Sequence, residues 1–100
     1  MSVAMTDAEI NERLQNLPGW TREGGAIQKV YELDSYTAGL VLASAVGAVC
    51  EGLNHHPDIL IGYKKVTVKL STHDIGNAIS PRDFETAEAI ERLGYPKPRP

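Results

Sequence analysis

The sequence predicts an α+β domain of two layers, in which three helices cover one face of a four-stranded antiparallel sheet. Start signals for helices occur near Thr6, near Ser35 and at Ser80-Pro81-Arg82-Asp83. Two pairs of strand-like runs lie between these signals, and the link within each pair is too short for a helix. The expected order is therefore helix, strand, strand, helix, strand, strand, helix.

The first helix is expected to begin at Thr6, because Thr6-Asp7-Ala8-Glu9 has the form of a capping box. Ile10, Leu14 and Leu17 then fall on one helical face and are predicted to pack in the core. Pro18-Gly19 ends this segment.

The first pair of strands is predicted at 20–23 and 26–33, joined by the turn Gly24-Gly25, whose residues tolerate positive φ. The second of these strands alternates imperfectly. Ile27, Tyr31 and Leu33 share one face, but Lys29 falls on the same face. Trp20, which precedes the turn, is interpreted as a packing residue.

The second helix is expected to run from Tyr36 to Gly52, with Asp34 or Ser35 as its cap. It has no charged side chain between Thr37 and Cys50, yet this apolar run is shorter than the roughly 20 residues that span a bilayer. A helix that is apolar all round must be buried on more than one side. We therefore expect one side to cover the sheet and the other to form a homodimer or homotetramer. Alternatively, Gly39 and Gly47 only let the helix approach its own sheet.

The second pair of strands is predicted at 58–63 and 65–71, the latter with Val66, Val68 and Leu70 on one face and polar residues on the other. Ser80 opens the last helix and Gly94 ends it. A single domain is expected over residues 1–94. Three prolines in residues 95–100 predict an extended tail.

Composition excludes several classes of function. The formal net charge of −3 gives no basic stripe for nucleic acid. The lone Cys50 cannot form an intramolecular disulfide, and the first residues carry neither a basic region nor a long apolar run. These features predict a cytoplasmic protein that binds neither nucleic acid nor a membrane.

All three histidines lie between Glu51 and Asp83, at positions 55, 56 and 73. His73 follows the fourth strand, and the pair His55-His56 precedes the third, so a hairpin would bring them together. Imidazole titrates near neutrality, with an ordinary pKa of about 6.5. Glu51 stands four residues before His55 and would share its side of a continuing helix.

Three interpretations of these histidines stay open at this point. A metal site is possible because imidazole is a common zinc ligand, although adjacent histidines rarely chelate one ion well and the only thiol lies in an apolar helix. A purely structural role is the second interpretation. The third is a metal-free acid–base site, which the residues favour slightly over a metal site.

The spacing of these residues resembles a known family. Glu51-x-x-x-His55-His56-Pro57, the aromatic Tyr63, His73 and Asp83 match its signature, as does Gly19-Trp20 before the first hairpin. The chain resembles the pterin-4a-carbinolamine dehydratases, also called dimerisation cofactor of a homeodomain transcription factor. The resemblance implies a lyase that dehydrates 4a-hydroxytetrahydrobiopterin to the quinonoid dihydropterin, recycling the pterin of aromatic amino-acid hydroxylases.

The resemblance also implies roles for single residues. His55, His56 and His73 would form the acid–base set, and it leaves open which of them is the acid. Glu51 would orient His55, Pro57 and Thr72 would shape the pocket wall, and Asp83 would support the site besides capping its helix. The pterin would be the substrate, with no metal and no separate cofactor. Asp58-Ile59 and Asn77 depart from the usual family pattern of an aromatic and a glycine.

A second hypothesis belongs to another class of function. The domain would then be an interaction or assembly module that keeps the fold and binds a protein partner. The apolar second helix motivates this alternative.

Overall fold

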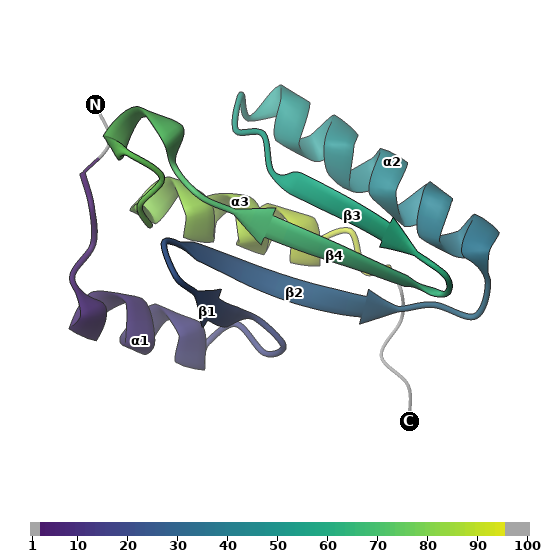
Figure 1. The fold of residues 1–100 in the computed structure, drawn as a ribbon, viewed down its shortest axis with the longest axis horizontal. Coiled ribbons are helices and arrows are strands. Elements are labelled where there is room, and N and C mark those ends of the chain that lie inside the picture. The colour runs from purple at the N-terminus through teal and green to yellow at the C-terminus, as the bar shows by residue number, and fades with distance from the viewer. Residues whose placement is uncertain (1–2, 96–100) are drawn as a thin grey trace.

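The computed structural model describes residues 3–95. It confirms the predicted α+β order of three helices and four strands, and adds a short 3₁₀ helix, η1, after the fourth strand (Figure 1). The elements are α1 (Asp7–Gln15), β1 (Thr21–Glu23), β2 (Ala26–Glu32), α2 (Tyr36–Gly52), β3 (Asp58–Gly62), β4 (Lys65–Leu70), η1 (His73–Ile75) and α3 (Pro81–Glu91). The expected tail at 95–100 lies outside the described residues, except Tyr95.

The four strands form one antiparallel sheet in the order β1-β2-β4-β3. The two predicted hairpins are joined through β2 and β4, where Ile27 pairs with Leu70. β3 pairs with the other side of β4, where Asp58 faces Lys69. This order places the β1–β2 turn, the start of β3 and the end of β4 at the same end of the sheet.

The helix starts follow the predicted caps. The Thr6 hydroxyl and the Glu9 carboxylate form a reciprocal capping box on α1. Of the two candidate caps for α2 the structure selects Ser35, whose hydroxyl accepts a hydrogen bond from the Ala38 N–H at 3.0 Å. On α3 the cap is Ser80, and Asp83 completes a second capping box.

One face of the sheet is buried under the helices. The side chains of Val66, Val68 and Leu70 on β4 are fully buried, whereas Lys65 and Lys69, which alternate with them on the opposite face, are exposed. The buried side shares one core with residues of all three helices: Ile10 of α1, Leu42 and Val46 of α2, and Phe84 and Ile90 of α3. The other face of the sheet is open, so polar side chains of β4 can contact a ligand there.

The structure explains why Lys29 interrupts the apolar face of β2. Its ammonium contacts Glu91 Oε1 at 2.9 Å, and the Tyr31 hydroxyl donates to Glu91 Oε2 at 2.5 Å. Burial, followed by the Glu91 carboxylate, raises the pKa of the Tyr31 hydroxyl. Burial opposes ionisation of Glu91, but hydrogen bonds from Tyr31 and Lys29 outweigh it and lower the pKa of this carboxyl. The positive charge of Lys29 is therefore balanced by the carboxylate of Glu91, the last residue of α3.

Helix α2 has a buried and an exposed apolar side. Gly39, Leu42, Val46 and Cys50 face the core at helical spacing. A Cβ at Gly39 would lie 3.3 Å from Val66 Cγ2, whereas one at Gly47 would meet nothing within 4 Å. Close approach to the sheet therefore explains Gly39 but not Gly47.

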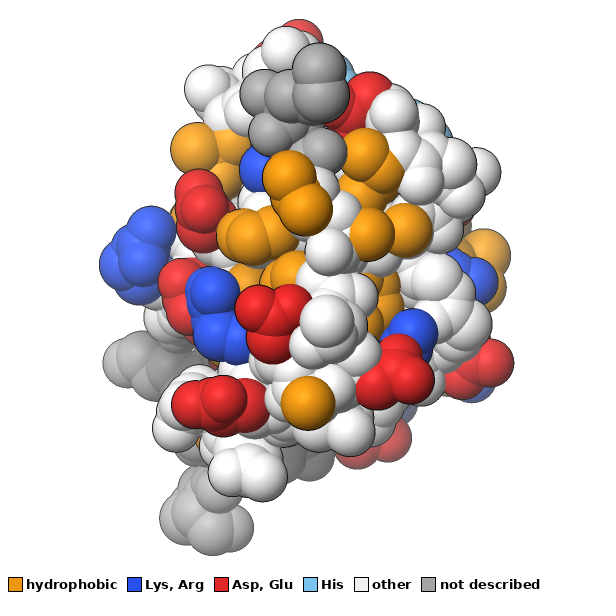
Figure 2. Space-filling view, turned by 90° about the vertical axis from the view of Figure 1, so that its left-hand side faces the viewer, with side chains coloured by type: hydrophobic (Ala, Val, Ile, Leu, Met, Phe, Trp, Pro, Cys, Tyr) orange, Lys and Arg blue, Asp and Glu red, His pale blue; other side chains and the backbone are white. Residues whose placement is uncertain are grey.

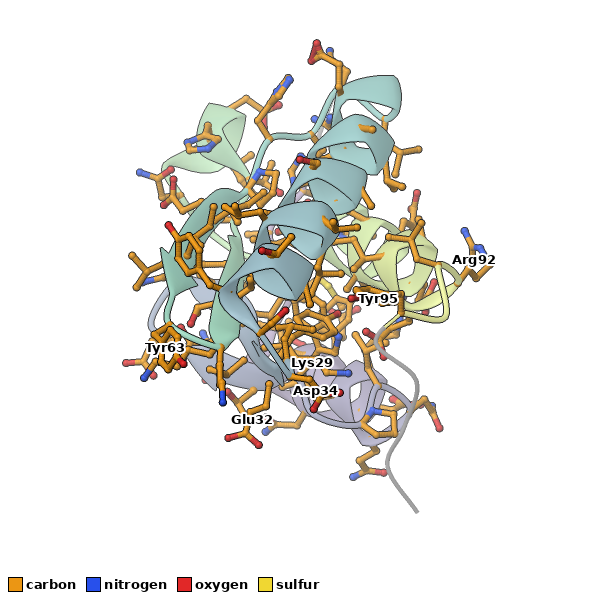
Figure 3. All side chains as sticks on the ribbon, turned by 90° about the vertical axis from the view of Figure 1, so that its right-hand side faces the viewer. Lys29, Glu32, Asp34, Tyr63, Arg92 and Tyr95 are labelled. Carbon is orange, nitrogen blue, oxygen red and sulfur yellow. The ribbon has the colours of Figure 1, made fainter. Side chains whose placement is uncertain are left out.

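The outer side of α2 carries Tyr36, Leu40 and Val41, all exposed, and the helix runs along the outside of the molecule in Figure 3. Among the described residues, no helix has both the length and the apolar character needed to cross a membrane.

Candidate active site

A cavity of about 420 Å³ opens on the uncovered face of the sheet, at the end where both hairpins meet. Four segments line it: the β1–β2 turn with Glu23, Gly24, Gly25 and Ala26; the start of β3 with His56 and Asp58; the end of β4 with Lys69 and Ser71; and the next loop with His73 and Asn77. Two of the three histidines therefore reach one cavity from separate segments of the chain.

His56 and His73 are brought together by the β3–β4 hairpin. Asp58 pairs with Lys69, and continuing this register by two residues places His56 opposite Ser71, just before His73. His56 Nε2 lies 2.6 Å from Glu51 Oε1. A carboxylate only accepts hydrogen bonds, so Nε2 is the donor in this contact. The other ring nitrogen, Nδ1, makes no contact with Glu51 and is the atom through which His56 could exchange a proton with a ligand. Within residues 3–95 the His73 side chain has no hydrogen-bond or ion-pair partner.

The expectation that Glu51 orients His55 is wrong, because Glu51 contacts His56 instead. Helix α2 ends at Gly52, and Asn54 has a positive φ of 53°. The chain therefore turns before His55, and the helical spacing of four residues no longer places the two side chains together. His55 is 5% exposed and does not line the cavity.

His55 instead contacts Asp83, with 2.5 Å between Nε2 and Oδ1. The other carboxylate oxygen of Asp83 accepts from the Thr72 hydroxyl at 2.8 Å and from the Ser80 N–H at 2.9 Å. The hydroxyls of Thr72 and Ser80 are 2.6 Å apart. This buried network joins the segment before β3, the end of β4 and the start of α3. It therefore anchors the residue that precedes each cavity histidine, His55 before His56 and Thr72 before His73.

Three other predicted residues take different places. Thr72 and Pro57 lie outside the cavity lining, Thr72 as part of the buried network and Pro57 as a half-buried residue beside His56. Tyr63 lies in the β3–β4 turn at the far end of the sheet and is 74% exposed (Figure 3). The aromatic ring of Tyr63 is thus remote from the histidines.

Sequence reasoning placed only His56 and His73 at the cavity. The charged or hydroxyl-bearing residues it did not place there are Glu23, Asp58, Lys69 and Ser71. For the last two a signal existed, because they occupy the polar positions of the alternating fourth strand. For Asp58 the sequence shows only a departure from the family pattern. Its place in the cavity follows from its pairing with Lys69 on the open face.

The β1–β2 turn packs directly against the loop that carries His73. The Ser71 hydroxyl donates to the Gly25 carbonyl at 2.9 Å. A Cβ at Gly25 would lie only 2.2 Å from the Asn77 carbonyl oxygen. Asn77 itself has a φ of 60°, a conformation that favours glycine or asparagine. The absence of a side chain at Gly25 therefore allows this wall of the cavity to close.

Replacement of this glycine tests the close contact. We expect Gly25→Ala to lower the free energy of unfolding by about 1–3 kcal/mol, because backbone must shift to admit the methyl group. The matched control is Gly24→Asn, since Gly24 has a φ of 59° and nothing within 4 Å of its Cβ position. Urea unfolding measures both. Equal stability of Gly25→Ala and wild type would contradict the contact.

Two observations bear on metal binding. Among the described residues, no group of three or more His, Cys, Asp or Glu side chains is arranged to hold a metal ion. Burial raises the pKa of the Cys50 thiol to about 11, so this thiol stays protonated at neutral pH.

Charged side chains of both signs are mixed on one face of the molecule. Figure 2 views the molecule from the left-hand side of Figure 1 and shows hydrophobic side chains gathered among acidic and basic ones. Lys and Arg form no continuous stripe on this face.

Comparison with known proteins identifies the family. A family profile described as Pterin 4 alpha carbinolamine dehydratase matches residues 3–93. The chain belongs to this family. A relative from Roseiflexus castenholzii is 42% identical over 93 residues, which cover 93% of this chain and 99% of the relative. One from Natronomonas pharaonis is 40% identical, with 93% and 98% covered. Both carry the name pterin-4-alpha-carbinolamine dehydratase as a provisional assignment.

Two solved structures are similar to this dehydratase-family chain. A transcriptional coactivator/pterin dehydratase from Brucella melitensis has a TM-score of 0.83 and 26% identity, covering 91% of this chain and 98% of that one. A pterin dehydratase-like protein described as a RuBisCO assembly factor in the alpha-carboxysome has a TM-score of 0.59 and 19% identity, covering 76% and 87%. The second likeness shows the fold alone.

Proposed function

We propose that this protein is a lyase that dehydrates 4a-hydroxytetrahydrobiopterin to the quinonoid dihydropterin, with His56 and His73 as its acid–base pair. The observation that carries the proposal is the meeting of these two imidazoles at one cavity, in a chain of this family. The pterin is then a substrate, and no metal or further cofactor takes part. The proposal places the protein in the cytoplasm, where it recycles the pterin of aromatic amino-acid hydroxylases.

The reaction needs one proton delivered and one removed. The hydroxyl on carbon 4a leaves as water once an acid protonates it, and the carbon–oxygen bond breaks. A double bond forms between carbon 4a and the neighbouring ring nitrogen N5, which loses its proton to a base. No electrons are exchanged with a second reactant. Imidazoles supply both roles near neutral pH, one giving and the other taking a proton.

We propose that His55 is a positioning residue in this reaction, although the family resemblance places it in the acid–base set. Its ring is buried against Asp83 and lies outside the cavity lining. The hydrogen bond fixes the segment that continues into His56. Glu51 in turn holds the His56 ring by Nε2. These supports fix the geometry in which an acid–base pair works.

The proposed activity is tested with freshly generated 4a-hydroxytetrahydrobiopterin, whose loss of water is followed by absorbance. We expect the purified protein to accelerate formation of the quinonoid product over the buffer rate, with and without a chelator. A folded protein that leaves the buffer rate unchanged would overturn the proposal. If the protein is active without the chelator but inactive with it, a metal site would replace the metal-free mechanism.

A second candidate function is an interaction or assembly module, and the exposed apolar side of α2 favours it. In a monomer, three large apolar side chains on this side would be in contact with water: those of Tyr36, Leu40 and Val41. If no second copy of the chain covers this side of α2 in the purified protein, we expect a different protein to bind there. The two candidates are separated by the oligomeric state and by the dehydration assay.

We propose that a second copy of the chain covers this side of α2 in a homodimer or homotetramer. We expect Val41→Glu to lower the mass of the assembly to that of a monomer, because a buried unpaired carboxylate is costly. The matched control is Val30→Glu, since Val30 is similarly exposed at 48% but lies on the open sheet face. Light scattering after size-exclusion chromatography measures the mass. A monomeric wild-type protein, or an unchanged Val41→Glu assembly, would contradict the proposal.

A further inference from the structure

Two oppositely charged side chains stand beside the histidines on the open face of the sheet. Asp58 and Lys69 are directly opposite each other on β3 and β4, and both line the cavity. Cβ atoms of such cross-strand partners are about 5 Å apart. Within the described part of the chain, neither side chain has a hydrogen-bond or ion-pair partner. Both are therefore available to a ligand.

Their position relative to the histidines follows from the register. Asp58, the first residue of β3, comes two residues after His56, a separation of at most about 7 Å in an extended chain. Lys69 is likewise two residues before Ser71, and both residues line the cavity with His56 and Asp58. A ring held with its reacting carbon between His56 and His73 would extend over this pair.

The pyrimidine edge of a pterin has a pattern that this pair complements. The 2-amino group and the N3–H are neighbouring donors, and the oxygen on carbon 4 is an acceptor. A carboxylate accepts two parallel hydrogen bonds, and a lysine ammonium donates. Carbon 4 is bonded directly to carbon 4a, the reacting carbon. The recognised edge therefore lies next to the reacting centre, as Asp58 and Lys69 lie next to the histidines.

The other carboxylate of the cavity is too far away for this role. Glu23 lies on β1, and the strand order β1-β2-β4-β3 puts it three strand spacings from β3. At about 4.8 Å a spacing this is about 14 Å from the backbone that carries His56. Glu23 thus serves as a matched control, an acid in the same cavity that the pyrimidine edge does not reach.

We propose that Asp58 and Lys69 bind the pyrimidine edge of the substrate and make the cavity selective for 2-amino-4-oxo pterins. Asp58 accepts from the 2-amino group and N3–H, and Lys69 donates to the oxygen on carbon 4. This inference rests on the proposed function, since it assumes that a pterin occupies the cavity. It adds the two residues that determine which ring is accepted.

Fluorescence titration with pterin and with lumazine tests the assignment without any turnover. Lumazine has the same ring system but carries an oxygen in place of the 2-amino group. We expect wild type to bind pterin about tenfold more tightly, because lumazine sets an acceptor against the Asp58 carboxylate. Asp58→Asn removes this preference to within about twofold, since an amide can donate as well as accept. Glu23→Gln keeps it.

Lys69→Gln supplies a second, different signature. Both ligands carry the oxygen on carbon 4, so this change weakens both by a similar factor and leaves the preference intact. Equal binding of the two ligands by wild type, or an unchanged preference in Asp58→Asn, would overturn the inference while leaving the dehydratase proposal standing. Binding of neither ligand by folded wild type would overturn both.

Discussion

His73→Ala and His56→Ala are each expected to lower the dehydration turnover by a factor of about 10² or more. Each change removes one imidazole of the pair that gives and takes the two protons. Both side chains are exposed, so the free energy of unfolding should change by less than about 0.5 kcal/mol. The turnover number is measured at saturating pterin, and circular dichroism verifies the fold.

The control for this pair is Glu23→Gln, which changes a cavity residue that has no part in the proton transfers. Its turnover should stay within about a factor of three of the wild-type value, a much smaller change than the loss of about 10² expected for the histidine variants. Wild-type turnover in both histidine variants would show that the cavity is not the site of the reaction. Loss in only one of them would mean that water supplies the other role.

Asp83→Ala is expected to have the largest effect on stability, lowering the free energy of unfolding by about 3–5 kcal/mol. The carboxylate is fully buried and accepts from His55, Thr72 and the Ser80 N–H. Its removal leaves three buried polar groups without their partner. For a domain whose total stability is on the order of 10 kcal/mol, this is a large fraction. Urea unfolding at neutral pH measures the change.

Glu85→Ala is the matched control for Asp83, because Glu85 is an exposed acid on the same helix. It should change the free energy of unfolding by less than about 0.5 kcal/mol. Equal losses in the two variants would mean that the buried network contributes nothing specific. A stable Asp83→Ala protein with full activity would also remove the positioning role proposed for His55.

Local signals in the sequence were sufficient for the order of the three α-helices and four strands, although not for η1. Helix α2 begins at Tyr36 and ends at Gly52 as predicted, because a serine cap and an apolar run define it without distant contacts. The alternation of Val66, Val68 and Leu70 likewise determines which side of β4 is buried. Short links determine that each pair of strands forms a hairpin.

The pairing of side chains in the site could not be predicted in the same way. Glu51 contacts His56 because the chain turns at Asn54, which adopts a positive φ of 53°. Asparagine tolerates this conformation but does not require it, so the turn is not evident from the sequence. The His55–Asp83 contact joins residues far apart in the sequence. Such contacts depend on the packing of α3 against the sheet, and no spacing rule describes them.

The location of the cavity depends on the order of the strands. Two hairpins can join through different strands, and the sequence does not say which. Joined through β2 and β4, they place the Gly24–Gly25 turn beside the loop that carries His73. This order also puts Lys69 and Ser71 at the cavity. The clustering of the histidines in the sequence indicates the site, and the structure adds the residues around them.

The most direct test compares how fast wild type and His73→Ala convert freshly generated 4a-hydroxytetrahydrobiopterin, at equal concentrations of folded protein. We predict rapid conversion with wild type and a rate about 10² lower with His73→Ala, close to that of buffer. Equal acceleration by both proteins would contradict catalysis by His73 in this cavity. No acceleration by either would favour the interaction or assembly module instead.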